Sequence, residues 1–91
     1  MVKDRKYFVI SADYCEDDMN VGATIRAICD SEEEATKEIK EYHDTVVESA
    51  KYNSLEILED GFEEGDKYFC LTVEGPNGLE IYRADIEAIV L

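Results

Sequence analysis

The sequence predicts one α+β domain, a two-layer sandwich in which an antiparallel four- or five-stranded sheet carries a single amphipathic helix on one face. Two observations predict it. The segments follow the order ββαβββ, and short loops join most of them, which favours antiparallel neighbours packed under one helix. The chain has 91 residues, the length of one domain. We therefore expect residues 1–91 to form a single domain without a linker or an internal repeat.

The first two strands are predicted from residue type. Residues 6–14, KYFVISADY, are rich in aromatic and β-branched side chains, which favour strands. Residues 15–20 contain three consecutive acids and predict a hairpin loop. Residues 21–29 then form the returning strand. Because alternate residues of a strand point to the same side, we expect Ile25, Ala27 and Cys29 to share one face.

The helix has the clearest local signal. Ser31 can cap its first turn and Glu34 can close a capping box, while the acids nearby favour the positive end of the helix dipole. Apolar residues then recur at steps of three and four, as one stripe of an amphipathic helix requires. These are Ala35, Ile39, Tyr42, Val46 and Ala50. We expect the helix to end within residues 51–53, with Asn53 in the left-handed conformation.

The rest of the chain alternates between strands and turns. In order, it reads as a short strand (54–59), an acidic turn (60–66), a strand (67–74), a Gly-Pro-Asn-Gly hairpin (75–78) and a returning strand (79–83). Residues 86–91 either extend that last strand past a bend or form a separate short element.

Net charge is the most unusual feature of the sequence. There are 23 Asp and Glu residues against 9 Lys and Arg, which gives a formal charge of −14. Such a charge disfavours binding to DNA, RNA or an anionic membrane, and it attracts a partner protein with a basic surface in a salt-dependent way. High negative charge also confers solubility without any specific partner, so this alternative stays open.

The cysteines and the N-terminus indicate a cytoplasmic protein. The three cysteines are an odd number without CxxC spacing, which fits a reduced compartment better than a disulfide framework. Near the N-terminus, the apolar stretch after the basic residues is four residues long, so it predicts a strand and not a signal peptide. No segment approaches the roughly 20 apolar residues that span a bilayer.

Catalytic and metal-binding patterns are missing from the sequence. The single histidine, His43, falls at the margin of the helix stripe and predicts a structural residue at a solvent edge or partly packed. Counted from Glu16, the acidic loop has Gly22 seventh and Ala27 twelfth, which fails the EF-hand pattern. We therefore predict a protein that is not an enzyme and that has no cofactor and no metal.

Two acidic segments supply the candidate binding site. If every connection reverses the chain direction, the helix start and the turn after the third strand fall at the same end of the sandwich. The candidate partner-binding residues there are Glu32, Glu33, Glu34, Glu59, Asp60, Phe62, Glu63, Glu64 and Asp66, with Phe62 as an exposed apolar anchor. A second acidic patch at the opposite end consists of Glu16, Asp17 and Asp18.

Carboxylates on a small rigid fold can imitate the phosphates of a nucleic acid. The first hypothesis is therefore an inhibitor that mimics nucleic acid and blocks a basic nucleic-acid-binding protein or nuclease, of the anti-CRISPR or anti-restriction type that mobile elements use. The alternatives are an immunity protein or antitoxin that neutralises a cationic toxin, and an accessory acidic domain of unknown partner. We expect a monomer or a weak homodimer, paired through the first or last strand as an open sheet edge.

Overall fold

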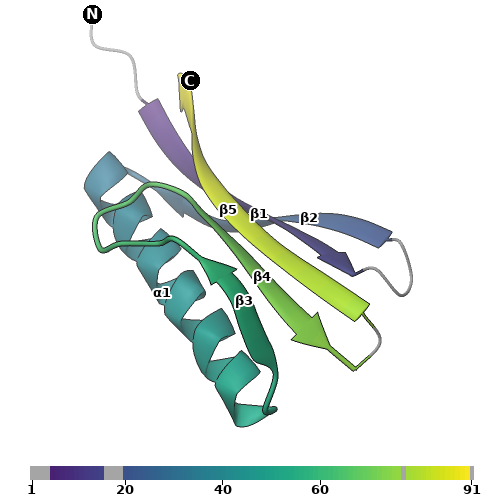
Figure 1. Ribbon diagram of the computed structural model, residues 1–91. Coiled ribbons are helices and arrows are strands. Elements are labelled where there is room, and N and C mark those ends of the chain that lie inside the picture. Colours follow the sequence, from purple (N-terminus) through teal and green to yellow (C-terminus); the bar gives the residue numbers. More distant parts are fainter. Residues whose placement is uncertain (1–4, 16–19, 77, 91) are drawn as a thin grey trace, which may run out of the picture.

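One helix packs on one face of a five-stranded antiparallel sheet in the order ββαβββ, which confirms the predicted fold class (Figure 1). The computed structural model describes residues 5–15, 20–76 and 78–90. Its elements are β1 (Arg5–Cys15), β2 (Asn20–Cys29), α1 (Glu32–Tyr52), β3 (Glu56–Asp60), β4 (Phe69–Gly75) and β5 (Gly78–Val90). Each helix or strand begins and ends close to its predicted position. Of the two alternatives for the end of the chain, the structure has the extended strand, since β5 is one strand of 13 residues.

The strand order is β2-β1-β5-β4-β3, so the last strand lies in the middle of the sheet. The whole length of β1 pairs with β5, from Arg5 opposite Val90 to Cys15 opposite Glu80. The expectation that the first or last strand is an open edge was therefore wrong, because each has a neighbour on both sides: β1 lies between β2 and β5, and β5 lies between β1 and β4. The edges are β2 and β3, and α1 crosses the sheet to connect them.

The predicted Ser31 cap of α1 is confirmed, since Ser31 Oγ accepts a hydrogen bond from the Glu34 amide at 3.1 Å. The reciprocal contact differs from the predicted capping box, because Glu34 Oε2 accepts from the Asp30 amide, at 3.4 Å, and not from the Ser31 amide. The end of the helix differs from the expectation. Asn53 has a φ of −89°, and the left-handed residue is Ser54, with a φ of 58°. The turn is closed by the Leu55 amide, which donates to the carbonyl of Ala50 at 2.8 Å.

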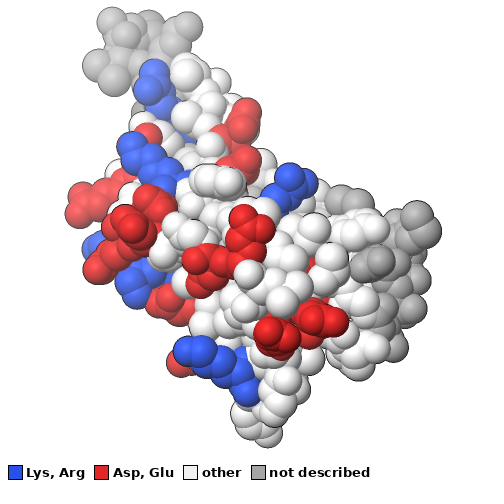
Figure 2. Space-filling view, viewed as in Figure 1, with Lys and Arg blue, Asp and Glu red and all other residues white. Residues whose placement is uncertain are grey.

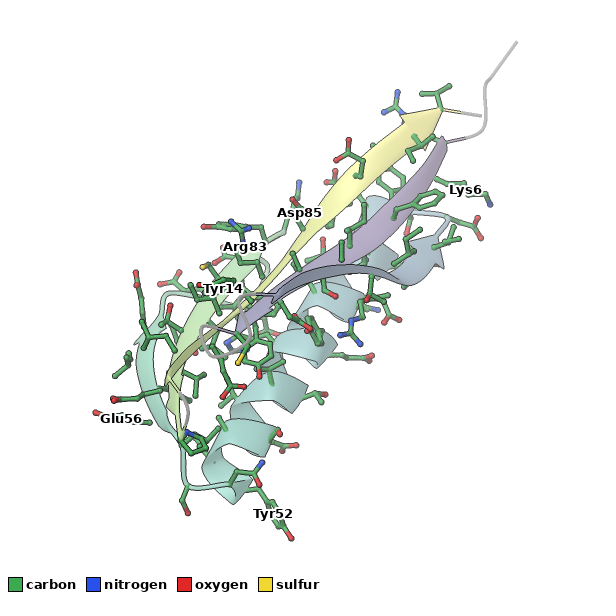
Figure 3. All side chains as sticks on the ribbon, turned by 90° about the vertical axis from the view of Figure 1, so that its right-hand side faces the viewer. Lys6, Tyr14, Tyr52, Glu56, Arg83 and Asp85 are labelled. Carbon is green, nitrogen blue, oxygen red and sulfur yellow. The ribbon has the colours of Figure 1, made fainter. Side chains whose placement is uncertain are left out.

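The core lies between α1 and the inner face of the sheet. Its largest fully buried apolar side chains are Ile39 from the helix and Val9, Phe69, Leu71 and Val73 from the strands. They alternate along β1 and β4 with residues that point to the other side, as the two-residue period of a strand requires. No described element covers the outer face of the sheet, which is the side opposite the helix (Figures 1 and 3).

A bulge in β2 overturns one predicted face. Val9 pairs with Ala27 but Ile10 pairs with Ile25, so Arg26 has no partner on β1. The extra residue turns Ile25 to the outer face beside Ile10, where Ile25 is 56% exposed. The expectation that Ile25 shares a face with Ala27 and Cys29 was therefore wrong. The bulge also directs the Arg26 side chain to the inner side of the sheet.

The core position of Ile39 gives a test of the packing. Ile39→Ala should lower the free energy of unfolding by about 2–5 kcal/mol, because a fully buried side chain leaves a cavity when it is truncated. Tyr52→Ala is the matched control on the same helix, since Tyr52 is 89% exposed and should change stability by less than about 0.5 kcal/mol. Urea denaturation followed by circular dichroism measures both, and equal losses would contradict the assigned core.

Candidate functional site

The two acidic segments meet at one end of the molecule, as the alternating chain direction predicts. The loop between β3 and β4 passes the first turns of α1 (Figure 1). Lys67 Nζ lies 2.5 Å from Glu32 Oε1, which joins the loop to the helix start. A shallow hollow of about 350 Å³ is lined by both segments, including Glu32, Glu33, Glu64 and Lys67. We call Glu32, Glu33, Glu63, Glu64 and Asp66 the acidic end.

Lysines interrupt this negative surface. Lys37, Lys40 and Lys67 line the same hollow as the acids. Lys40 Nζ is 2.7 Å from Asp44 Oδ2, and Lys67 pairs with Glu32. On the left of Figure 2, over the helix start and the β3–β4 loop, red carboxylates and blue amino groups accordingly lie side by side. The acidic end is therefore a mixed surface in which the carboxylates are in excess.

His43 anchors the loop to the helix. The residue is 8% exposed, with Nε2 at 3.0 Å from both Asp60 oxygens and Nδ1 at 3.0 Å from Asp44 Oδ1. The ring stacks on Phe62, with 4.3 Å between centroids. Its two nitrogens therefore contact one carboxylate on β3 and one on its own helix. The expectation was a structural histidine at a solvent edge or partly packed, and the ring is packed more deeply than that because the loop folds over it.

Asp60 and Phe62 hold the base of the loop. Asp60 Oδ1 accepts a hydrogen bond from the Phe62 amide at 3.1 Å, and the Phe62 ring is half-buried against His43 and Phe69. The expected exposure of Phe62 was therefore wrong. Beyond it, Asp66 Oδ2 accepts from the Glu63 amide at 2.9 Å, which closes a turn. These contacts leave the loop with a defined shape.

The structure brings some of the remaining sequence candidates together and leaves others apart. Glu34 is exposed but caps the helix, and Glu59 lies at the end of the β3 edge, opposite Thr72, on the outer face of the sheet. Glu32, Glu33, Glu63, Glu64 and Asp66 are exposed together at the acidic end. The second patch, Glu16, Asp17 and Asp18, lies outside the described residues.

The network around His43 also shifts the ionisation of its neighbour. A hydrogen bond from Lys40, and then one from His43, lowers the pKa of Asp44 below its ordinary value. The same pairing with Asp44 raises the pKa of Lys40. Both groups therefore stay charged over a wide pH range, and their ion pair lies beside His43 within α1.

A second polar cluster, which sequence reasoning missed, joins β2 to the helix. Arg26 Nε donates to Ser11 Oγ at 2.9 Å, and Nη2 donates to the Tyr42 hydroxyl at 3.1 Å. Tyr42 in turn donates to Asp13 Oδ1 at 3.0 Å. Burial, followed by the charge of Asp13, raises the pKa of Tyr42, so its hydroxyl keeps its proton. Only the bulge at Arg26 makes this cluster possible, and periodicity does not reveal the bulge.

This cluster borders a hollow of about 240 Å³ between the helix and the inner sheet face, with Val46, Leu55 and Val73 among its walls. On its rim the pKa of Tyr82 is raised by burial and by a hydrogen bond to Glu80. In the described part of the chain, no buried side-chain nitrogen or oxygen lacks a hydrogen-bond partner. The polar groups around this hollow therefore satisfy one another.

Among the described residues, no three His, Cys, Asp or Glu side chains gather in a way that could hold a metal ion. Both nitrogens of the single histidine already contact carboxylates. No helix in the described ranges has the length and apolar character that crossing a membrane requires.

Comparisons of this chain with protein-family models, with curated proteins and with solved structures gave no match. Its class therefore follows from the fold and the surfaces alone. It is a small α+β domain with one acidic end and one face of its sheet uncovered by any described element.

The role of His43 can be tested by His43→Leu, which keeps a side chain of similar size but removes both ring nitrogens. Without the contact between His43 Nε2 and Asp60, the variant should lose about 1–3 kcal/mol of stability. The Phe62 amide should also exchange its hydrogen faster, because Asp60 no longer holds it in place. Thr45→Leu is the control, because the exposed Thr45 hydroxyl bonds only to the Glu41 carbonyl of its own helix. Equal Phe62 exchange rates in wild type and His43→Leu would refute the anchoring role.

The pKa shift of Asp44 predicts a pH dependence. Because this pKa is lower in the folded protein than in the unfolded chain, the carboxylate contributes stability above its unfolded value, about 3.9, and loses it as pH falls through the folded pKa. Asp44→Asn should therefore destabilise the protein at pH 7, and the difference from wild type should shrink toward about pH 2. Glu41→Gln removes an exposed helix carboxylate as a control. A pH-independent difference for Asp44→Asn would contradict the shift.

Proposed function

We propose that this protein is a non-enzymatic binding protein that blocks a basic nucleic-acid-binding protein, such as a nuclease, by occupying its nucleic-acid site. The supporting observation is the meeting of two acidic segments, the helix start and the β3–β4 loop, at one end of a protein with a net charge of −14. Lys and Arg side chains that bind phosphate can form charge-assisted hydrogen bonds with carboxylates instead.

The carboxylates that can face a partner are those without an internal ion pair. Glu33, Glu63 and Glu64 are exposed and make no ion pair within the described part of the chain, whereas Glu32 is paired with Lys67. These three acids come from two elements and can contact a cationic groove together. Added salt screens the attraction between these carboxylates and a basic partner, so binding should weaken as ionic strength rises.

The rigidity of the loop supports the proposal. The stacking of Phe62 on His43 and the hydrogen bonds of Asp60 fix the loop before any partner arrives. Binding then orders fewer groups, and this lowers its entropic cost. A preformed array of carboxylates is what substitution for a nucleic-acid backbone requires.

The experiment is affinity capture from a nuclease-treated lysate, followed by titration of the captured protein with this one while its nucleic-acid binding or cleavage is measured. Wild type should inhibit at low salt. The triple variant Glu33→Lys, Glu63→Lys, Glu64→Lys should weaken inhibition at least about tenfold, because it replaces attraction with repulsion at the interface.

The matched control reverses three other exposed acids, Glu41, Glu48 and Glu56, to Lys, and so changes the net charge equally. Circular dichroism checks that both variants fold. If both triple variants lose inhibition equally, net charge alone is responsible. Undiminished inhibition by the first triple variant, or capture of only unrelated basic proteins, would contradict the proposal.

A further inference from the structure

The outer face of the sheet carries an apolar patch that no described element covers. We define the sheet patch as Phe8, Ile10 and Ala12 on β1 with Ile25 and Ile28 on β2. Its members are contiguous, since Phe8 pairs with Ile28 and Ile10 pairs with Ile25. Ile25 is 56% and Ile28 is 61% exposed. A contiguous apolar surface of this kind on a highly charged protein indicates an interaction site.

Three charged residues of β5 border the sheet patch, namely Arg83, Asp85 and Glu87, the last of which pairs in register with Phe8. Arg83 pairs in register with Ala12, and Asp85 pairs with Ile10, so the two side chains stand on the same face two residues apart. Figure 3 shows both on the side of the sheet away from the helix. Neither forms an ion pair within the described residues. Together with Tyr68, which is 60% exposed, they line a hollow of about 260 Å³.

The residues of this surface indicate which kind of partner fits it. Arg and Tyr beside apolar residues are typical of protein interfaces. A basic protein would bring its positive charges against Arg83 in the middle of the face. A second copy of this chain instead supplies both Asp85 to meet Arg83 and an apolar patch to meet the sheet patch. Charge complementarity therefore favours self-association over the basic partner proposed for the acidic end.

We propose that two copies pack face to face through this surface. The two-fold axis lies between the sheets, perpendicular to β5, at the level midway between Arg83 and Asp85. This operation reverses the strand direction, so Arg83 of each copy faces Asp85 of the other and the ion pair forms twice. The contact is isologous and closes at two copies.

The same axis brings apolar rows together. The axis places β1 of one copy over β1 of the other. Ile10 of one copy then lies at the level of Ala12 of the other, and Phe8 lies at the level of Tyr14. Two sheets pack in this way about 10 Å apart, with an angle of roughly 30° set by their twist. The protein extends 53 × 26 × 17 Å along its principal axes, which leaves room for the roughly 800 Å² that each partner contributes to a standard interface.

Net charge sets the salt dependence of this dimer. Two copies with a charge of −14 each repel one another, and added salt screens this repulsion. Dimerisation should therefore strengthen as ionic strength rises, whereas binding of a basic partner at the acidic end should weaken. The opposite responses separate the two surfaces in one series of measurements.

Sedimentation equilibrium at about 50 and 500 mM NaCl tests the proposal. Wild type should approach twice its mass of 10.4 kDa at micromolar concentrations, more completely at high salt. Arg83→Asp and Asp85→Arg should each raise the dissociation constant at least about tenfold, because each places like charges opposite one another twice. Mixing these two variants should restore a dimer, since each Asp then faces an Arg in both contacts.

The control pair Lys51→Asp and Glu48→Arg alters charge on the helix and should not weaken dimerisation. The triple Lys variant of the acidic end should also still dimerise, so failure of the proposed function and failure of this inference are distinguishable. A wild type that stays monomeric at high salt, or a mixture of Arg83→Asp and Asp85→Arg that stays monomeric, would overturn the proposed dimer.

Discussion

The pairing of β1 with β5 is the constraint on which the rest of this structure depends. It runs the full length of β1 and brings the first and last strands of the chain together in the middle of the sheet. With those positions taken, β2 and β3 become the edges, and α1 has to cross the sheet to connect them. Because α1 is the only helix among the described residues and crosses one face, it covers that face and leaves the other bare. The central pairing of β1 with β5 therefore leads to both the packed inner face and the uncovered outer face.

Polar contacts complete a core that is small for its sheet. A chain of 91 residues buries a modest apolar volume, and here two polar clusters extend the contact between helix and sheet. His43 bonds to Asp60 at the end of β3 and to Asp44 on its own helix. Its neighbour Tyr42 bonds to Arg26 and so joins β2 to the helix. The first cluster also shapes the loop that carries Glu63 and Glu64, so a structural contact and the proposed binding surface share the same residues.

Charge and apolar surface are separated in space, which allows two different kinds of contact. The acidic end lies at the helix start, whereas the sheet patch lies on β1 and β2 on the far side of the sheet. Salt screens attraction at the first surface and repulsion at the second. In a face-to-face dimer both acidic ends remain outside the contact, so self-association doubles the array of carboxylates and does not compete with it.

By itself the sequence determined the helix and strands, the Ser31 cap, the fold class and the two acidic segments, because capping, periodicity and turn chemistry act between residues close in the chain. Tertiary structure alone decided which strands are edges, because the pairing of β1 with β5 joins residues far apart in sequence. It likewise decided the exposure of Ile25, which follows from a bulge at Arg26, and the burial of His43 and Phe62, which follows from the loop folding over the helix. Local pattern carries no information on such contacts, since their partners come from other elements.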